Sequence, residues 1–194
     1  MRRKLTMKKF KVGDKVRAKV IEIKEGKIQV FFEDECHLLE GNVCGLTWCP
    51  RNQKVEIPIE NPKNRQTYYG SFNALTGQFH PQMQRAGNTE NTIDYLKYLS
   101  SLYPDSKIWM FWDGAKYHSG KGVREYLESI NQVLEEKDWK IRLFKFAPHA
   151  PEQNPVEQIW SAAKNFLRRN FSKNKNFEEI KKCFLDFLNQ NTFY

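Results

Sequence analysis

The sequence predicts an α/β protein with a mixed five-stranded sheet flanked by helices. Two observations carry this prediction. Short segments rich in β-branched and aromatic residues, separated by Gly, Pro and Asn, fill the first part of the chain. Further along, segments with apolar residues at helical spacing alternate with short apolar runs. A meander followed by such alternating units gives antiparallel strands joined to parallel ones, with helices covering the sheet.

The N-terminal part is expected to contain the antiparallel strands. The segment KIQVFFEDE (27–35) is a buried strand that runs into acidic residues. Three more strands are expected at 42–49, 54–59 and 65–75, because turn-forming residues separate these segments. Residues 10–23 (FKVGDKVRAKVIEI) alternate between apolar and polar, which predicts a pair of strands flanking the sheet.

The second part of the chain is expected to alternate between helices and parallel strands. The run KIWMFWD is almost continuously apolar, as in a strand covered on both faces. Apolar residues three and four positions apart predict the helices, and Pro104 follows the first of them. The expected elements are a helix at 91–104, strands at 107–113 and 140–147, and helices at 122–136, 155–170 and 177–190. This order matches the RNase H-like fold, with the last helix packed on the domain.

Three acidic residues are expected to meet at one edge of this sheet. Asp34 ends the first strand, Asp113 ends the strand after the meander, and Glu157 lies in the first turn of a long helix. In open α/β sheets, sites form beyond the carboxyl ends of the strands. Carboxylate oxygens suit Mg²⁺ or Mn²⁺, and two such ions roughly 4 Å apart can activate a hydroxyl and stabilise a leaving oxygen.

The segment before Glu157 is unusually restrained. Asn154 is a good helix N-cap and Pro155 is a favoured first helical residue, so Glu157 falls in the third helical position. On the same helix, Lys164 and Arg168 share a face with Glu157 that is separate from the apolar stripe. This arrangement suits a metal ligand followed by phosphate-binding groups.

Each acid taken alone also has an ordinary explanation. Glu157 could cap its helix, Asp34 could be a solvated charge, and Asp113 could form a turn with Gly114. Three acids at three element ends favour the shared site. A zinc site is an alternative at Cys36 and its neighbours, but the spacing of Cys36, His37, Cys44 and Cys49 fits no common zinc motif.

The formal net charge of +9, from 32 basic and 23 acidic residues, predicts a polyanionic partner, with nucleic acid ahead of a membrane surface. The candidate phosphate contacts are Lys116, Lys121, Lys164, Arg168 and Arg169. No apolar run approaches the roughly 20 residues of a membrane span, and no signal peptide is evident. We therefore expect a cytoplasmic protein with reduced cysteines.

Four motifs resemble the catalytic domain of DDE transposases, in the bacterial insertion-sequence branch related to mariner elements. They are FFEDECHL (31–38), RQTYYGSFNALTGQFH (65–80), WDGAKYHSGKGVREYL (112–127) and FAPHAPEQNPVEQIWSAAKNFLRR (146–169). The resemblance implies an RNase H-like fold with Asp34, Asp113 and Glu157 as the catalytic, metal-binding triad. It also implies Mg²⁺- or Mn²⁺-dependent DNA cleavage at transposon ends, followed by strand transfer by a 3′-hydroxyl.

Several residues are expected to support the triad without being ligands. Glu35 is a neighbour of the first acid, His118 could orient a site carboxylate or anchor its loop, and Asn154 positions the third acid. Two features depart from the family pattern. Gly114 stands where relatives often have Asn, and residues 114–156 form a longer gap between the second and third acids than is common.

The expected organisation is a basic flank at 1–24, the catalytic domain at 25–170 and a C-terminal helix at 171–194. The flank is too short for a three-helix DNA reader. The expected partners are therefore DNA, a separate helix-turn-helix protein from an upstream reading frame, and a second copy of the chain. The alternatives are a non-catalytic DNA- or partner-binding transposase remnant, and an RNase H-fold nuclease acting on RNA–DNA hybrids.

Overall fold

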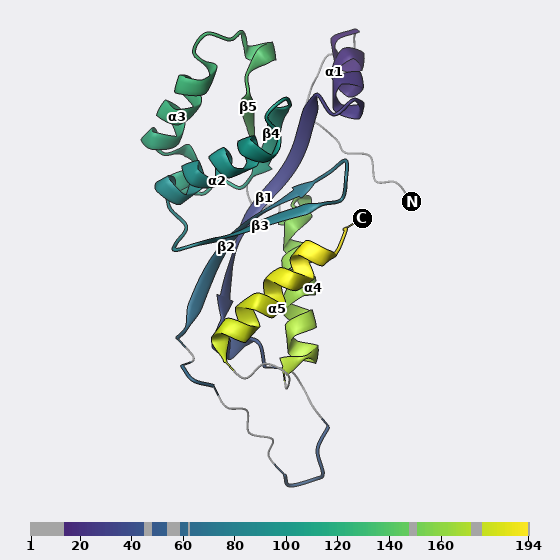
Figure 1. The fold of residues 1–194 in the computed structure, drawn as a ribbon, viewed down its shortest axis with the longest axis vertical. Helices are drawn as coiled ribbons and strands as arrows, with labels where there is room; N and C mark the ends of the chain where they lie inside the picture. Colours follow the sequence, from purple (N-terminus) through teal and green to yellow (C-terminus); the bar gives the residue numbers. More distant parts are fainter. Residues whose placement is uncertain are drawn as a thin grey trace.

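The computed structural model describes residues 14–44, 48–53, 59–61, 63–147, 151–171 and 176–193. Its centre is a five-stranded sheet with the strand order β3-β2-β1-β4-β5 (Figure 1). The strands are β1 (Ile28–Leu39), β2 (Arg65–Asn73), β3 (Phe79–Gln84), β4 (Lys107–Trp112) and β5 (Ile141–Lys145). The first three pair antiparallel, whereas β4 runs parallel to both β1 and β5. The predicted mixed sheet is confirmed.

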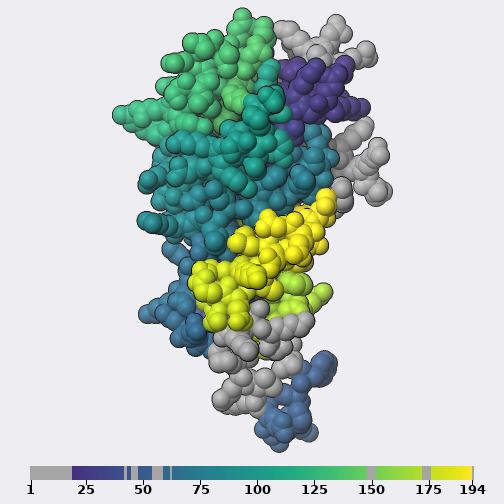
Figure 2. Space-filling model, in the orientation of Figure 1, coloured from purple at the N-terminus to yellow at the C-terminus, as the bar shows by residue number. Residues whose placement is uncertain are grey.

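Helices cover both faces of the sheet (Figure 1). One face of β1 carries Phe31 and packs with α2 (Thr89–Leu102) and α3 (Lys121–Asn131). The other face carries Phe32 and packs with α4 (Val156–Arg169) and α5 (Phe177–Gln190). In the space-filling view, α5 lies in front of part of α4 (Figure 2), and it also packs on the sheet itself, where Phe184 meets Tyr68 of β2. The two cores fix the direction in which every β1 side chain points.

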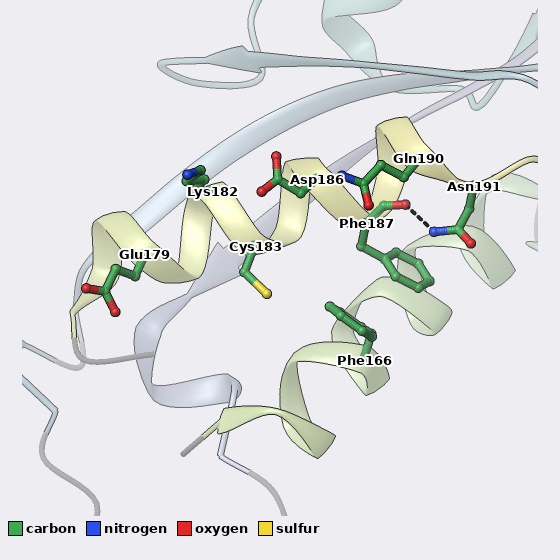
Figure 3. A pocket seen from close by; sticks show the side chains of 8 residues that line it. All are labelled: Phe166, Glu179, Lys182, Cys183, Asp186, Phe187, Gln190 and Asn191. Carbon is green, nitrogen blue, oxygen red and sulfur yellow. Dashed lines mark hydrogen bonds between the residues drawn. The ribbon is translucent and has the colours of Figure 1, made fainter. Parts of the chain in front are cut away.

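Helix α5 packs along α4 and agrees with the helix predicted at 177–190. The rings of Phe166 and Phe187 stack with centroids 4.7 Å apart across this contact (Figure 3). Asn176 caps the start of α5 by accepting a hydrogen bond from the Glu179 amide at 2.9 Å. The hollow beside these rings is lined by none of the predicted site residues.

The antiparallel meander differs from the prediction. The prediction of a strand at 42–49 is wrong for the described residues of that segment, which form no strand. The short 3-10 helix η1 (Glu40–Asn42) follows the end of β1 there. The Glu40 carboxylate holds the returning chain by accepting from the Glu60 amide at 3.0 Å and Asn64 Nδ2 at 2.9 Å. The strand expected at 54–59 lies almost entirely outside the described residues.

The third strand of the meander is instead β3, which the sequence did not predict. Pro81 lies inside it, and proline is tolerated there because β3 is at the edge of the sheet. Asn73 turns the chain between β2 and β3, since its Oδ1 accepts from the amides of Leu75 and Thr76 at 2.9 and 3.2 Å. Gly77 completes the turn with a φ of 72°.

The strand pair expected at 10–23 is wrong from residue 14 onwards, where the chain forms α1 (Asp14–Lys24). Gly26 ends this helix in the left-handed conformation, at φ 73°. The Lys27 amide donates to the Glu22 carbonyl at 2.9 Å and the Gly26 amide donates to the Ile23 carbonyl at 3.0 Å. This is a Schellman ending, so Gly26 was the signal for a helix that the alternating apolar residues obscured.

Helix α3 is shorter than the predicted 122–136. Asn131 ends it, because its side chain accepts from the Lys140 amide at 2.8 Å and donates to the Ile141 carbonyl at 3.1 Å. The chain then continues through the short 3-10 helix η3 (Glu136–Asp138) into β5. Within the residues described, no helix is long and apolar enough to cross a membrane.

Candidate active site

The first two predicted acids are carried by two neighbouring parallel strands, with Asp34 inside β1 and Asp113 directly after β4. In the β1–β4 pair, Phe32 lies beside Phe111. Continuing that register by two residues places Asp34 beside Asp113, which directly follows β4. The prediction that Asp34 ends its strand is wrong, because β1 continues to Leu39 and stays paired with β2. The candidate site therefore lies where β4 ends beside the continuing β1.

Strand alternation separates the three consecutive acids of β1. Asp34 points to the α4 side of the sheet, whereas Glu33 and Glu35 point to the α2 side with Phe31. Burial, the charge of Glu35, and the charges of Glu157 and Asp113 raise the pKa of Asp34 to about 7. The contribution of Glu157 to that shift indicates that the first and third acids are within electrostatic reach of each other.

Helix α4 approaches the sheet closely beside Asp34. The residue opposite Asp34 on β2 is Gly70. A Cβ at Gly70 would lie 2.3 Å from a ring atom of Phe79 and 2.5 Å from a ring atom of Trp160. Only glycine at this position lets the Trp160 ring, and with it α4, pack so near the first acid.

Asn154 fixes the start of α4, which carries the exposed Glu157 as its second residue. Asn154 Oδ1 accepts from the Val156 amide at 3.2 Å, and Pro155 already has helical angles (φ −65°, ψ −18°). Asn154 Nδ2 donates to the Glu33 carbonyl at 3.0 Å. One buried side chain therefore caps the helix and ties its start to the strand that carries Asp34.

Asp113 is held through one carboxylate oxygen. Its Oδ1 accepts from the Ala115 amide at 2.8 Å and lies 3.0 Å from His118 Nδ1. The hydrogen bond from His118 lowers the pKa of Asp113. A Cβ at the neighbouring Gly114 would meet open space. Crowding at the Cβ position therefore does not require glycine there.

His118 lies buried against the ring of Trp112, within hydrogen-bonding distance of Asp113 and of Glu35 on β1. Its Nε2 is 2.9 Å from Glu35 Oε1 and 3.7 Å from Glu33 Oε2. Burial alone would lower the pKa of His118, but the hydrogen bonds with Asp113 and Glu35 outweigh it and raise the pKa to about 10. The imidazole is therefore a cation at neutral pH and balances the surrounding carboxylates.

Glu33 is a site residue that the sequence reasoning missed. Its side chain is 1% exposed, and neither carboxyl oxygen has a hydrogen-bond partner among the residues that the structure describes. Burial and then the charge of Glu35 raise its pKa well above the usual range, which favours the protonated form. The signal was available in the strand period, because residues 31, 33 and 35 must share the face that Phe31 buries.

One group of the described residues has ligand atoms close enough together to share a divalent ion. Ligand atoms of Glu33, Glu35 and His118 lie within 4.8 Å of one another. An ion there would have to displace the Glu35–His118 hydrogen bond and ionise a fully buried acid. The predicted acids Asp34, Asp113 and Glu157 do not form such a close group in the described residues. Burial first, and then the charges of neighbouring carboxylates, raise the pKa of Asp34, and a bound cation would offset the part that those carboxylates cause. The chemistry of three carboxylates suits Mg²⁺ or Mn²⁺, but their ligand atoms would have to come closer together to share one ion.

The predicted phosphate contacts divide into two groups. Lys164, Arg168 and Arg169 lie on α4, and Lys164 lies close enough to Cys36 to offset part of the rise that burial causes in the thiol pKa. The structure places Lys116 in the 3-10 helix η2 (Lys116–Ser119) and Lys121 at the start of α3, where it pairs with Glu125 at 3.5 Å. Sequence reasoning missed Lys145, whose charge helps to lower the pKa of Asp113.

The strand order of the mixed sheet and the helices on both of its faces are those of an RNase H-like domain. The model of the DDE superfamily endonuclease family matches residues 29–181, so the chain belongs to that family. A comparison with curated proteins gives no match.

Solved structures share the fold. A chain of the simian T-cell lymphotropic virus intasome, solved with PP2A regulatory subunit B56 gamma, has a TM-score of 0.55 at 12% identity, over 80% of this chain and 46% of that one. The magnesium-bound HTLV-2 integrase catalytic core has a TM-score of 0.52 at 12% identity, over 82% of this chain and 81% of that one. Mos1 transposase, in a paired-end complex with the left transposon end, has a TM-score of 0.53 at 11% identity, over 100% of this chain and 67% of that one. Our chain thus spans less than half of the intasome chain.

Proposed function

We infer that this protein is the catalytic domain of a DNA transposase of the bacterial insertion-sequence type, which cleaves phosphodiester bonds and transfers the resulting strand. The observation that carries this inference is that Asp34 lies in β1 and Asp113 directly follows β4, the parallel neighbour of β1, while Asn154 ties the start of the helix of Glu157 to β1. Membership of the DDE endonuclease family supports the same conclusion.

Asp34, Asp113 and Glu157 would hold Mg²⁺ or Mn²⁺, with two ions expected. Such ions activate an attacking water or 3′-hydroxyl and stabilise the leaving oxygen. The chain itself contributes a rigid set of carboxylates, because Asn154 and His118 fix the elements that carry them. The HTLV-2 integrase core with the same fold is described with magnesium, which supports the choice of ion.

The DNA would lie along the exposed side of α4. Lys164 and Arg168 follow Glu157 on that helix, and Lys116 and Lys145 flank Asp113 on the other side of the site. The similar Mos1 structure holds a transposon end, which supports DNA as the substrate. A helix-turn-helix partner from an upstream reading frame and a homodimer remain predictions.

Nicking of supercoiled plasmid in Mg²⁺ or Mn²⁺ tests this function. Wild-type protein should nick the plasmid, whereas Asp113→Asn should not, although it should still bind DNA because it loses no phosphate contact. An Asp113→Asn protein that nicks as well as wild type would overturn the proposed site.

Two rival functions give different results in the same assay. A non-catalytic remnant would bind DNA without nicking by either protein, even with the product of the upstream reading frame added. A nuclease for RNA–DNA hybrids would cleave the RNA strand of a hybrid faster than duplex DNA. The complete set of three acids favours the transposase over the remnant.

A further inference from the structure

The geometry around His118 points to a role beyond packing, and this role rests on the proposed function. We propose that His118 is a positioning residue for the metal site, which clamps the Asp113 carboxylate to Glu35 on β1 so that Asp113 presents its other oxygen to the ion. The clamp is the three-residue unit Asp113–His118–Glu35.

The imidazole of His118 has little freedom to move. The side chain is fully buried, and its ring stacks on Trp112 with centroids 4.3 Å apart and an interplanar angle of 3°. The Tyr117 ring packs edge-on against it at 4.7 Å and 76°. A ring fixed on two sides can aim its two nitrogens in constant directions.

Both nitrogens are aimed at carboxylates. Nδ1 lies 3.0 Å from Asp113 Oδ1, and Nε2 lies 2.9 Å from Glu35 Oε1. An ionised carboxylate only accepts hydrogen bonds, so the ring donates from both nitrogens when both partners are ionised. The clamp therefore joins the end of β4 to β1 through one rigid group.

The clamp leaves one face of Asp113 available. Its Oδ1 takes the bonds from His118 and from the Ala115 amide, and all hydrogen bonds found for this carboxylate in the described residues go to Oδ1. The Asp113 side chain is 55% exposed, in contrast to its fully buried partner. Fixing one oxygen restricts the carboxylate before an ion arrives, which is how residues behind a metal ligand raise affinity.

Glu35 anchors the clamp on the side of the sheet opposite Asp34. The two residues are adjacent in β1, so alternation sends one to the ion and the other to His118. This arrangement makes the distance between the first two acids depend on the imidazole bridge as well as on the sheet hydrogen bonds.

Mn²⁺ affinity, measured by the electron paramagnetic resonance signal of free Mn²⁺, tests the clamp without requiring DNA cleavage. His118→Gln carries its donors on one nitrogen and lacks the two N–H groups that the rigid ring aims in different directions, so its Mn²⁺ affinity should fall by about tenfold or more. His80→Gln is the matched control, because His80 is a second histidine, partly buried, whose ring bonds Tyr103 Oη at 2.9 Å. The control should keep wild-type affinity.

Equal affinity in His118→Gln and wild type would overturn the clamp, as would an equal loss in His80→Gln. A wild-type affinity that Asp113→Asn does not change would overturn the proposed metal site and the clamp with it. The two failures are therefore distinguishable.

A second measurement on the wild-type protein covers the case in which His118→Gln does not fold. In ¹⁵N-histidine-labelled protein, Mg²⁺ should shift the Nδ1–H resonance of His118, because the ion withdraws charge from the bonded Asp113 carboxylate. The His80 resonances should stay in place. A His118 resonance that does not respond to saturating Mg²⁺ would contradict the proposal.

Discussion

Asn154 Nδ2 donates a hydrogen bond to the Glu33 carbonyl across 3.0 Å, which joins the start of α4 to the middle of β1. The same side chain caps α4 through Val156. The stiff segment before Glu157 therefore ends in a residue that sets the third acid against the strand of the first.

Replacing Asn154 tests this attachment. Asn154→Ala should lower the free energy of unfolding by about 1–3 kcal/mol, because it uncaps α4 and leaves a buried carbonyl without its donor. The cleavage rate should fall as well, since Glu157 is no longer fixed. Asn176→Ala is the control, because it removes the analogous cap of α5 far along the chain from the acids. Asn176→Ala should lower the free energy of unfolding by about 1 kcal/mol and leave the cleavage rate unchanged. Equal rates in the two variants would contradict the attachment.

Gly70 allows the close approach of α4, so enlarging it should harm both stability and activity. Gly70→Ala should cost about 1–3 kcal/mol, because the new Cβ would overlap the rings of Phe79 and Trp160. Thermal or denaturant unfolding measures the loss. Gly114→Ala is the comparison, since its Cβ meets open space and the stability should change by less than about 0.5 kcal/mol. A Gly70→Ala protein as stable as wild type would show that α4 is not so tightly packed.

The raised pKa of Asp34 predicts how the stability of the metal-free protein depends on pH. The folded state keeps a proton up to about pH 7, whereas the unfolded chain releases it near pH 4. The folded protein therefore binds more protons between these values, so its stability falls as pH rises from about 4 to about 7.

Asp34→Asn removes this dependence. At pH 8 in the presence of EDTA, we expect the variant to be more stable than wild type by on the order of 1–3 kcal/mol. Saturating Mg²⁺ should reverse the order, because it stabilises only the protein that binds it. Unfolding curves that run parallel over the whole pH range would contradict the environment assigned to Asp34.

The basic face of α4 predicts a change in salt dependence. Lys164→Ala combined with Arg168→Ala should reduce the slope of log K for DNA binding against log salt concentration by up to about 2, since each phosphate contact contributes about 0.9. Lys97→Ala serves as control, because Lys97 lies on α2 and pairs with Asp94 at 3.8 Å. If the double variant keeps the wild-type slope, Lys164 and Arg168 do not contact DNA phosphates.

The sequence was sufficient to predict a mixed sheet with helices on its faces and the elements that carry the acids, but not every strand of the sheet. Segment 177–190 predicts a helix and the apolar run of β4 predicts a strand, because helices and strands repeat their apolar residues with different periods. The predictions failed where a single contact decides the structure. Asn131 ends α3 early, Gly26 ends an unexpected α1, and Pro81 obscured an edge strand.

In the candidate site, too, some features follow from local sequence patterns and others depend on contacts between distant residues. Positions at element ends, such as Asp113, follow from the chain order, whereas the surroundings of Glu33 depend on which side of the sheet α2 covers. The network around His118 joins residues 35 and 113 through three elements, and no local pattern contains that information.

The most direct test of this account is the position of a bound ion. A crystal of the protein grown with Mn²⁺ would locate the metal by its anomalous scattering. We expect a peak between the carboxylates of Asp34 and Asp113, on the α4 side of β1, with His118 still bonded to Asp113. A peak between Glu33, Glu35 and His118 on the opposite side of the strand would contradict the account.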